Sequence, residues 1–153
     1  ARESVSGELK NYMSSWVPWH EIRVNGKKIL FVHGEPLNPL NGYMYPDSDI
    51  SYFKNWDYDA IFMGHSHYPF IKKFQGDKLA VNVGSCGLPR DQGNLASCAI
   101  YDTDAHHCDI YRLKFNEKKL LSQYQGTVHN SVAMCLKRKR ENVFGRIVNA
   151  ESK

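Results

Sequence analysis

The stretch "AIFMGHSHYPF" (residues 60–70) places two histidines, His65 and His67, directly behind a short apolar run. Such a run, bounded by a glycine, is typical of a strand buried on both faces. Two other runs end alike, because "KILFVHG" stops at His33 and "LAVNVGS" stops at a glycine and a serine. Functional groups in open mixed sheets gather past the carboxyl ends of strands, where the loops diverge. The three histidines are therefore expected at one edge of a sheet.

Three hairpins are predicted around these strand ends. In "HEIRVNGKKILFVHG" (20–34), the pair Asn25-Gly26 is a strong signal for a two-residue hairpin turn. Two strand-forming runs flank a Gly-Asp turn in "FIKKFQGDKLAVNVGS" (70–85). Apolar and polar residues alternate on both sides of a short polar turn in "SCAIYDTDAHHCDIYRLKF" (97–115).

Helices are expected in the remaining segments, with the irregular loop 34–49 between the first hairpin and the second helix. The expected helices cover residues 7–16, 47–56, 117–124 and 129–140. In the second, Asp47 or Ser48 is placed to cap a stripe of Ile50, Phe53 and Trp56. Strands and helices mix along the chain, which predicts the α/β or α+β class.

Composition is that of an ordinary globular domain, with 153 residues, of which 42% are hydrophobic and 24% charged. No apolar run reaches the roughly 18 residues of a membrane span, and the first residues lack the pattern of an export signal. These features predict a soluble, cytoplasmic protein without a membrane partner.

The four cysteines form no C-x-x-C pair, so we expect them to be reduced. The net charge of +4 equals that of the run "KRKR" at 137–140.

The spacing of His65 and His67 suits two neighbouring metal ions. Residues i and i+2 share a face within a regular strand, but past a strand end the two rings can address separate points. Each imidazole could then bind one ion of a pair, and Mn, Fe, Zn and Ni all accept imidazole. A lone histidine at a strand end is more often a hydrogen-bonded loop residue, so the spacing by itself leaves both interpretations open.

Three segments in order, "ILFVHGEP", "YDAIFMGHSHYPF" and "LAVNVGSCGLPRD", resemble the calcineurin-like metallophosphoesterases, especially their small bacterial and archaeal phosphodiesterase branch. The resemblance covers roughly Leu9 to Tyr124. It implies an αββα sandwich of two mixed β-sheets flanked by helices, with a two-metal site on loops at strand ends. It also implies hydrolysis of a phosphoester, as a phosphodiesterase or phosphatase, by a metal-activated hydroxide.

By this resemblance, His33 and His65 bind one metal and His67 binds the other. The implied cofactors are two divalent ions, with Mn(II) as the first expectation and Fe, Zn or Ni as alternatives. The implied substrate is a phosphoester. Arg90 in "GLPRD" is a candidate phosphate contact, with a structural pair to Asp91 or to a neighbouring carboxylate as the alternative. Tyr43 is a candidate for stacking on a substrate ring, with a packing role as the alternative.

The chain departs from the family pattern upstream of His33. The family's Asp-x-His, Gly-Asp and Gly-Asn-His steps do not precede it, so no catalytic residue is identified in this chain. Asp104-Ala105-His106 lies downstream and is expected to be a solvated turn. Our hypothesis is that residues 1–125 are the C-terminal portion of the domain and that an N-terminal segment supplies the rest. Residues 126–153 are expected to form a C-terminal helix and a basic tail. The 153-residue chain alone is then expected to be inactive.

Two further interpretations stay open at the level of sequence. The run 137–140 is expected to satisfy the end of a helix, with nucleic-acid binding as the less favoured alternative. A non-catalytic protein-interaction scaffold is the rival to the enzyme, because one fold serves several functions. Sheet surface left open by the missing portion would also allow homo-oligomers.

Overall fold

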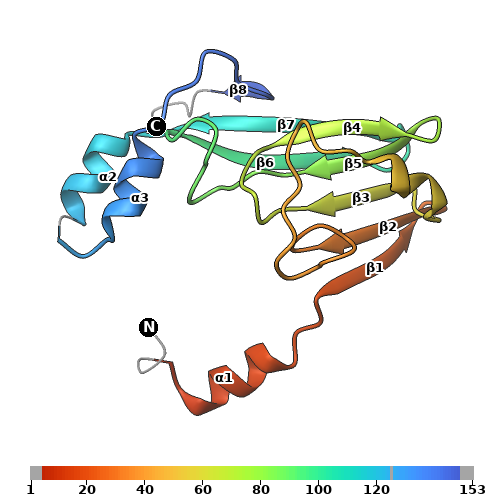
Figure 1. Cartoon of the computed structure of the whole chain (residues 1–153), viewed down its shortest axis with the longest axis horizontal. Coiled ribbons are helices and arrows are strands. Elements are labelled where there is room, and N and C mark those ends of the chain that lie inside the picture. Colours follow the sequence, from red (N-terminus) through yellow and green to blue (C-terminus); the bar gives the residue numbers. More distant parts are fainter. Residues whose placement is uncertain (1–4, 125, 149–153) are drawn as a thin grey trace.

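Two mixed β-sheets form the body of the protein, as the computed structural model describes it for residues 5–124 and 126–148 (Figure 1). The larger sheet has the order β1-β2-β3-β5-β4. Its strands are β1 (Trp19–Val24), β2 (Lys27–Val32), β3 (Ala60–Met63), β4 (Phe70–Phe74) and β5 (Lys78–Asn82). The smaller sheet consists of β6 (Leu95–Asp102), β7 (His107–Lys114) and β8 (Arg146–Val148). Two mixed sheets with few helices confirm the predicted fold class.

The three predicted hairpins are present, and their turns follow from the sequence. Asn25 and Gly26 have φ of 49° and 74°, and Gln75 and Gly76 have φ of 43° and 79°. Two successive residues with positive φ are the requirement of a type I′ turn, which matches the twist of the flanking strands. Strands β6 and β7 are antiparallel over eight residue pairs.

Three short α-helices lie outside the sheets (Figure 1). They are α1 (Gly7–Ser14), α2 (Glu117–Gln123) and α3 (Asn130–Leu136). The side chains of Ser6 and Asn116 cap the first two by accepting hydrogen bonds from backbone amides in the first turn. Among the described residues, no helix is long and apolar enough to cross a membrane.

The prediction of an α-helix at residues 47–56 is wrong. This segment contains only the 3₁₀-helix η2 (Ser51–Asn55), and no side chain caps it. Asp49 accepts hydrogen bonds from both the backbone amide and the hydroxyl of Ser51, each at 2.8 Å. This local turn competes with a regular first helical turn. The apolar stripe still packs on the sheet, with Phe53 fully buried.

The C-terminal helix ends earlier than expected, and its end corrects the interpretation of the basic run. Helix α3 stops at Leu136 with no basic residue in its last turn, so the run does not serve as a charged helix end. A strand, β8, then pairs in parallel with β7, which the sequence pattern did not predict. The proposed boundary at residue 125 lies outside the described residues, and the division of the chain there stays a prediction.

The two faces of the larger sheet carry separate apolar clusters. Between the sheets, Phe62 and Val81 of the larger sheet pack with Ile110 of the smaller one. On the opposite face, Met44 of the loop and Phe53 of η2 cover the larger sheet. This arrangement holds the loop after β2 against the sheet, next to the end of β3.

Candidate metal centre

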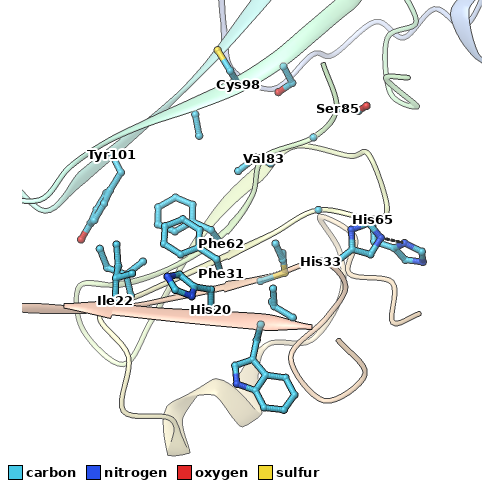
Figure 2. Close-up of a pocket in the computed structure, with 18 of the residues that line it drawn as sticks. His20, Ile22, Phe31, His33, Phe62, His65, Val83, Ser85, Cys98 and Tyr101 are labelled. Carbon is cyan, nitrogen blue, oxygen red and sulfur yellow. Dashed lines mark hydrogen bonds between the residues drawn. The ribbon is translucent and has the colours of Figure 1, made fainter. Parts of the chain in front are cut away.

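Parallel pairing brings the histidine-bearing strand ends together, as the sequence predicts. Strand β3 pairs in parallel with β2 on one side and with β5 on the other, so all three strands end at one edge. His33 follows β2 and His65 follows β3. The Nε2 atom of His33 and the Nδ1 atom of His65 are 2.8 Å apart, and Figure 2 shows the two rings meeting edge to face.

His67 is oriented by a hydrogen bond to the backbone. Its Nδ1 lies 2.7 Å from the carbonyl oxygen of Leu88. Because a carbonyl oxygen only accepts, Nδ1 carries a proton, and in the neutral tautomer the lone pair is then on Nε2. This is the arrangement in which a carbonyl fixes the tautomer of a metal-binding imidazole.

Backbone strain is concentrated at these two histidines. His65 and His67 have φ of 59° and 61°, in the left-handed region that residues other than glycine seldom adopt. The other described non-glycine residues with positive φ, Asn25, Gln75 and His106, belong to hairpin turns. Strain of this kind clusters at functional sites. The tight turn after β3 thus falls on the two histidines and not on the preceding Gly64.

Two buried polar side chains hold this strained loop in place. Asn82, at the end of β5, donates hydrogen bonds to the carbonyl of Gly64 at 2.8 Å and to the hydroxyl of Ser66 at 3.0 Å. Its own side-chain oxygen accepts from the amide of Gly84 at 3.0 Å. The Ser66 hydroxyl donates to the carbonyl of Met44 at 2.8 Å. Asn82 therefore satisfies backbone groups on both sides of the strand end.

Replacing Asn82 by alanine is expected to lower the free energy of unfolding by about 2–4 kcal/mol, because the buried groups it serves lose their partners. Urea denaturation followed by circular dichroism measures the change. The exposed Asn41, whose side chain donates no hydrogen bond within the described part of the chain, provides the control, and Asn41→Ala should stay within about 0.5 kcal/mol of the parent. A loss below about 1 kcal/mol for Asn82→Ala would show that the loop does not depend on this network.

The surroundings of His65 favour its neutral form. Burial lowers its pKa from the ordinary value, and charge repulsion from its neighbours, Arg90 among them, lowers it further. The neutral imidazole is the form that binds a metal ion.

The histidine geometry fits part of a two-metal ligand set. Two nitrogens bound to one ion at about 2.1 Å and at right angles to each other would be about 3.0 Å apart, close to the 2.8 Å between His33 and His65. Within the described ranges, however, no three His, Cys, Asp or Glu side chains gather so as to hold an ion. The residues described here therefore do not fit a complete pair of bridged ions.

The two candidate substrate contacts lie beside the histidines. The ring centroid of Tyr43 is 4.3 Å from that of His65. The backbone amide of Arg90 donates to the carbonyl of His67 at 3.3 Å. Asp91 is occupied by Arg112, at 2.5 and 2.9 Å, so the alternative pairing of Arg90 with Asp91 is wrong.

Glu35 and the Asp104–His106 turn have structural roles. Glu35 accepts a hydrogen bond from the hydroxyl of Tyr52 at 2.5 Å, which ties the loop to η2. Asp104 accepts from the side chain of Asn25 at 2.8 Å in the turn between β6 and β7. His106 of the same turn contacts the Tyr101 hydroxyl at 2.6 Å. This turn is held by hydrogen bonds to neighbouring elements, and its Asp and His side chains lie away from the strand-end histidines.

An apolar groove between the sheets leads to the histidines, and the sequence reasoning missed it. Its volume is about 980 Å³. Figure 2 shows Phe31 and Phe62 of the larger sheet on the side of Tyr101 of the smaller sheet, with His33 and His65 at one end. The hydroxyl of Ser97 in its wall is buried without a hydrogen-bond partner among the described residues. No local sequence signal reports such a groove, because it depends on which faces stay uncovered.

Comparison with known proteins agrees with this architecture. Two solved structures share the fold: PH1004 from Pyrococcus horikoshii OT3, with a TM-score of 0.72 and 20% identity, and a metallophosphoesterase from Sphaerobacter thermophilus, with a TM-score of 0.71 and 22% identity. Each match covers 88% of this chain, and 55% and 64% of those chains respectively. The fold is therefore of the metallophosphoesterase type.

The family follows from the sequence match. The family model of the calcineurin-like phosphoesterase superfamily domain matches residues 5–106, which is more than half of the chain. This chain belongs to that family, whose members are in general metal-dependent phosphoesterases. The uncharacterized protein MJ0912 of Methanocaldococcus jannaschii is 34% identical over 77% of this chain and 54% of its own length. The chain thus spans about half the length of MJ0912 and of PH1004.

Proposed function

We propose that this chain is part of a metal-dependent phosphoesterase and that His33, His65 and His67 are its imidazole ligands for two divalent ions. The observation that supports this most directly is the strained pair His65 and His67 at the end of β3, with His33 facing His65 at 2.8 Å. Bound ions of this kind lower the pKa of a water molecule and neutralise charge on phosphoryl oxygens. A site of mixed imidazole and carboxylate ligands suits Mn(II).

The chain's own residues orient and prepare this site. The Leu88 carbonyl holds Nδ1 of His67 in a hydrogen bond, so that Nε2 is the nitrogen left for a metal ion, and burial lowers the pKa of His65. Asn82 holds the backbone on which both histidines stand. Tyr43 and the backbone of Arg90 lie beside them, which supports the proposal that both residues contact the substrate.

The carboxylate ligands are proposed to come from outside this chain, as another portion of the same domain. The groove between the sheets supports this. The histidines lie at one end of it, and its lining is otherwise largely apolar, so it supplies no carboxylate to the site. Strand β6 pairs with β7 on one side, and in the described part of the chain its other edge is free to accept a strand. An incoming strand would cover the groove and could satisfy the buried Ser97 hydroxyl.

The test compares the 153-residue chain with the longest polypeptide that the native gene encodes. Metal analysis and hydrolysis of bis(p-nitrophenyl) phosphate are measured on both. We expect the longer polypeptide to hold two ions and to be active, with turnover abolished by chelation. The shorter chain should hold no tightly bound pair and show no turnover. Two tightly held ions on the shorter chain would contradict the proposed origin of the carboxylates, and an inactive longer polypeptide with bound metal would favour the scaffold.

A further inference from the structure

A second cavity of about 850 Å³ lies near the histidines and is strongly basic. Its cationic lining consists of Arg90, from the segment after β5, and of Arg138 and Arg140, from the segment after α3. Tyr45 and Tyr68 provide aromatic walls, and Asp47 is the one acidic residue among those that line it. Nothing in the proposed two-metal chemistry requires this cavity.

The basic run lies at the cavity because two hydrogen bonds join its backbone to Gln92 and Gly93, in the segment after β5. The carbonyl of Arg138 accepts from the amide of Gly93 at 3.0 Å, and the amide of Arg140 donates to the side chain of Gln92 at 2.7 Å. Arg138 and Arg140 line the cavity, whereas Lys139, between them, pairs with Glu117 at 3.5 Å.

Among the described residues, the positive charges of the three guanidinium groups are not balanced by neighbouring carboxylates in ion pairs. In the described part of the chain, none of them forms an ion pair with a carboxylate. Asp91, which is next to Arg90 in sequence, is buried against Arg112 instead. A guanidinium group matches the oxygens of a phosphate in a bidentate manner and is always charged. Three such groups around one hollow therefore favour a phosphate-bearing ligand.

A row of tyrosines connects this cavity with the histidines. The Tyr43 ring stacks at 5.9 Å on that of Tyr45, which in turn meets Tyr68 edge to face at 5.5 Å. The guanidinium carbon of Arg140 lies 5.0 Å from the centre of the Tyr68 ring. Tyr43 itself contacts His65. Aromatic faces that line a path between two phosphate-binding points favour a planar ring in the ligand.

We propose that the cavity of Arg90, Arg138 and Arg140 binds a second phosphate group of the substrate, and that the substrate is of the nucleotide class. The ring of the substrate stacks on the tyrosines while its scissile phosphoester lies at the histidines. This inference rests on the proposed function for the role of the histidines. It assigns to the basic run a contact with a small phosphorylated ligand.

The test uses paired variants that remove equal charge from neighbouring positions. Arg138→Gln with Arg140→Gln alters the two arginines of the run that line the cavity. Lys137→Gln with Lys139→Gln is the matched control, because neither lysine lines it. Binding of ATP to the protein in EDTA is measured by isothermal titration calorimetry, which needs neither metal nor turnover. We expect the arginine pair to weaken ATP binding by about tenfold or more and the lysine pair by about twofold or less.

Asp47→Asn gives a variant that leaves every arginine in place. Removing this carboxylate makes the cavity more positive, so ATP is expected to bind about twofold more tightly or better. Thermal melts of all variants check the fold. If the arginine pair fails to fold, Asp47→Asn still decides, since unchanged or weaker ATP binding would overturn the proposal.

Turnover separates this inference from the proposed function. In the longer polypeptide, the arginine pair is expected to raise KM for diadenosine tetraphosphate, which has phosphates beyond the scissile one, and to leave KM for bis(p-nitrophenyl) phosphate unchanged. No turnover of either substrate would contradict the proposed function, whereas ATP binding in EDTA would still test the cavity. The inference is overturned if the arginine and lysine double variants weaken ATP binding equally. It is also overturned if the protein binds a single-stranded oligonucleotide tightly but does not bind ATP.

Discussion

His65→Ala is expected to lower turnover of bis(p-nitrophenyl) phosphate by about 100-fold or more in the longer polypeptide. The reason is that even the outer partners of metal ligands typically cost about 10–100-fold when removed, so loss of a ligand should cost at least as much. His65 occupies the central position of the site, because its ring meets both His33 and Tyr43. Steady-state kinetics with metal in excess measures the effect, and metal analysis of the purified variant should show a loss of bound ions.

A matched control separates the site from the general loss of an imidazole. His107 is an exposed residue of β7, far from the strand-end histidines in the fold, and its ion pair with Asp109 is at the surface. His107→Ala should therefore keep turnover within about twofold, because surface pairs contribute little. Both variants should melt close to the parent. Full activity and full metal content in a folded His65→Ala protein would remove His65 from the proposed site.

Local patterns in the sequence accounted for most of the fold and for the position of the histidines. The Asn-Gly turn fixed the first hairpin, and the short apolar run before Gly64 marked the central strand. Both are signals over a few residues, so neighbours in sequence suffice to read them. The convergence of His33 with His65 followed from one further rule, that adjacent parallel strands end at the same edge.

Features that depend on distant partners were missed. Helix α3 ends early because the segment after it is hydrogen bonded near Gly93, 45 residues away in sequence from Arg138. Strand β8 is short, and its register comes from β7. The conformation of His65 was also beyond a local reading, because its positive φ is imposed by buried hydrogen bonds from Asn82. In each case tertiary contacts override local preference.

Local sequence patterns also failed to predict the buried ion pair between Arg112 and Asp91, which lies next to Arg90 of the basic cavity. Arg112 is fully buried on the inner face of β7, where alternation alone predicts an apolar residue. Besides its two contacts with Asp91, it donates to the carbonyls of Leu95 and Phe144, each at 3.0 Å. The pair joins the segment after β5 to the second sheet and to the chain before β8. It thereby fixes the backbone next to Arg90.

Asp91→Ala is expected to lower the free energy of unfolding by about 3–5 kcal/mol, because it leaves the guanidinium group of Arg112 buried without its counter-charge. For a chain of this size such a loss lowers Tm by about 6 °C or more. Asp77→Ala removes the exposed pair with Lys73 and should cost less than about 1 kcal/mol. Asp91→Leu with Arg112→Met removes both charges and should regain much of the stability, since apolar replacements of a buried pair are often neutral. A single Asp91→Ala variant as stable as Asp77→Ala would contradict the role of this pair, and calorimetry of all four proteins decides between these results.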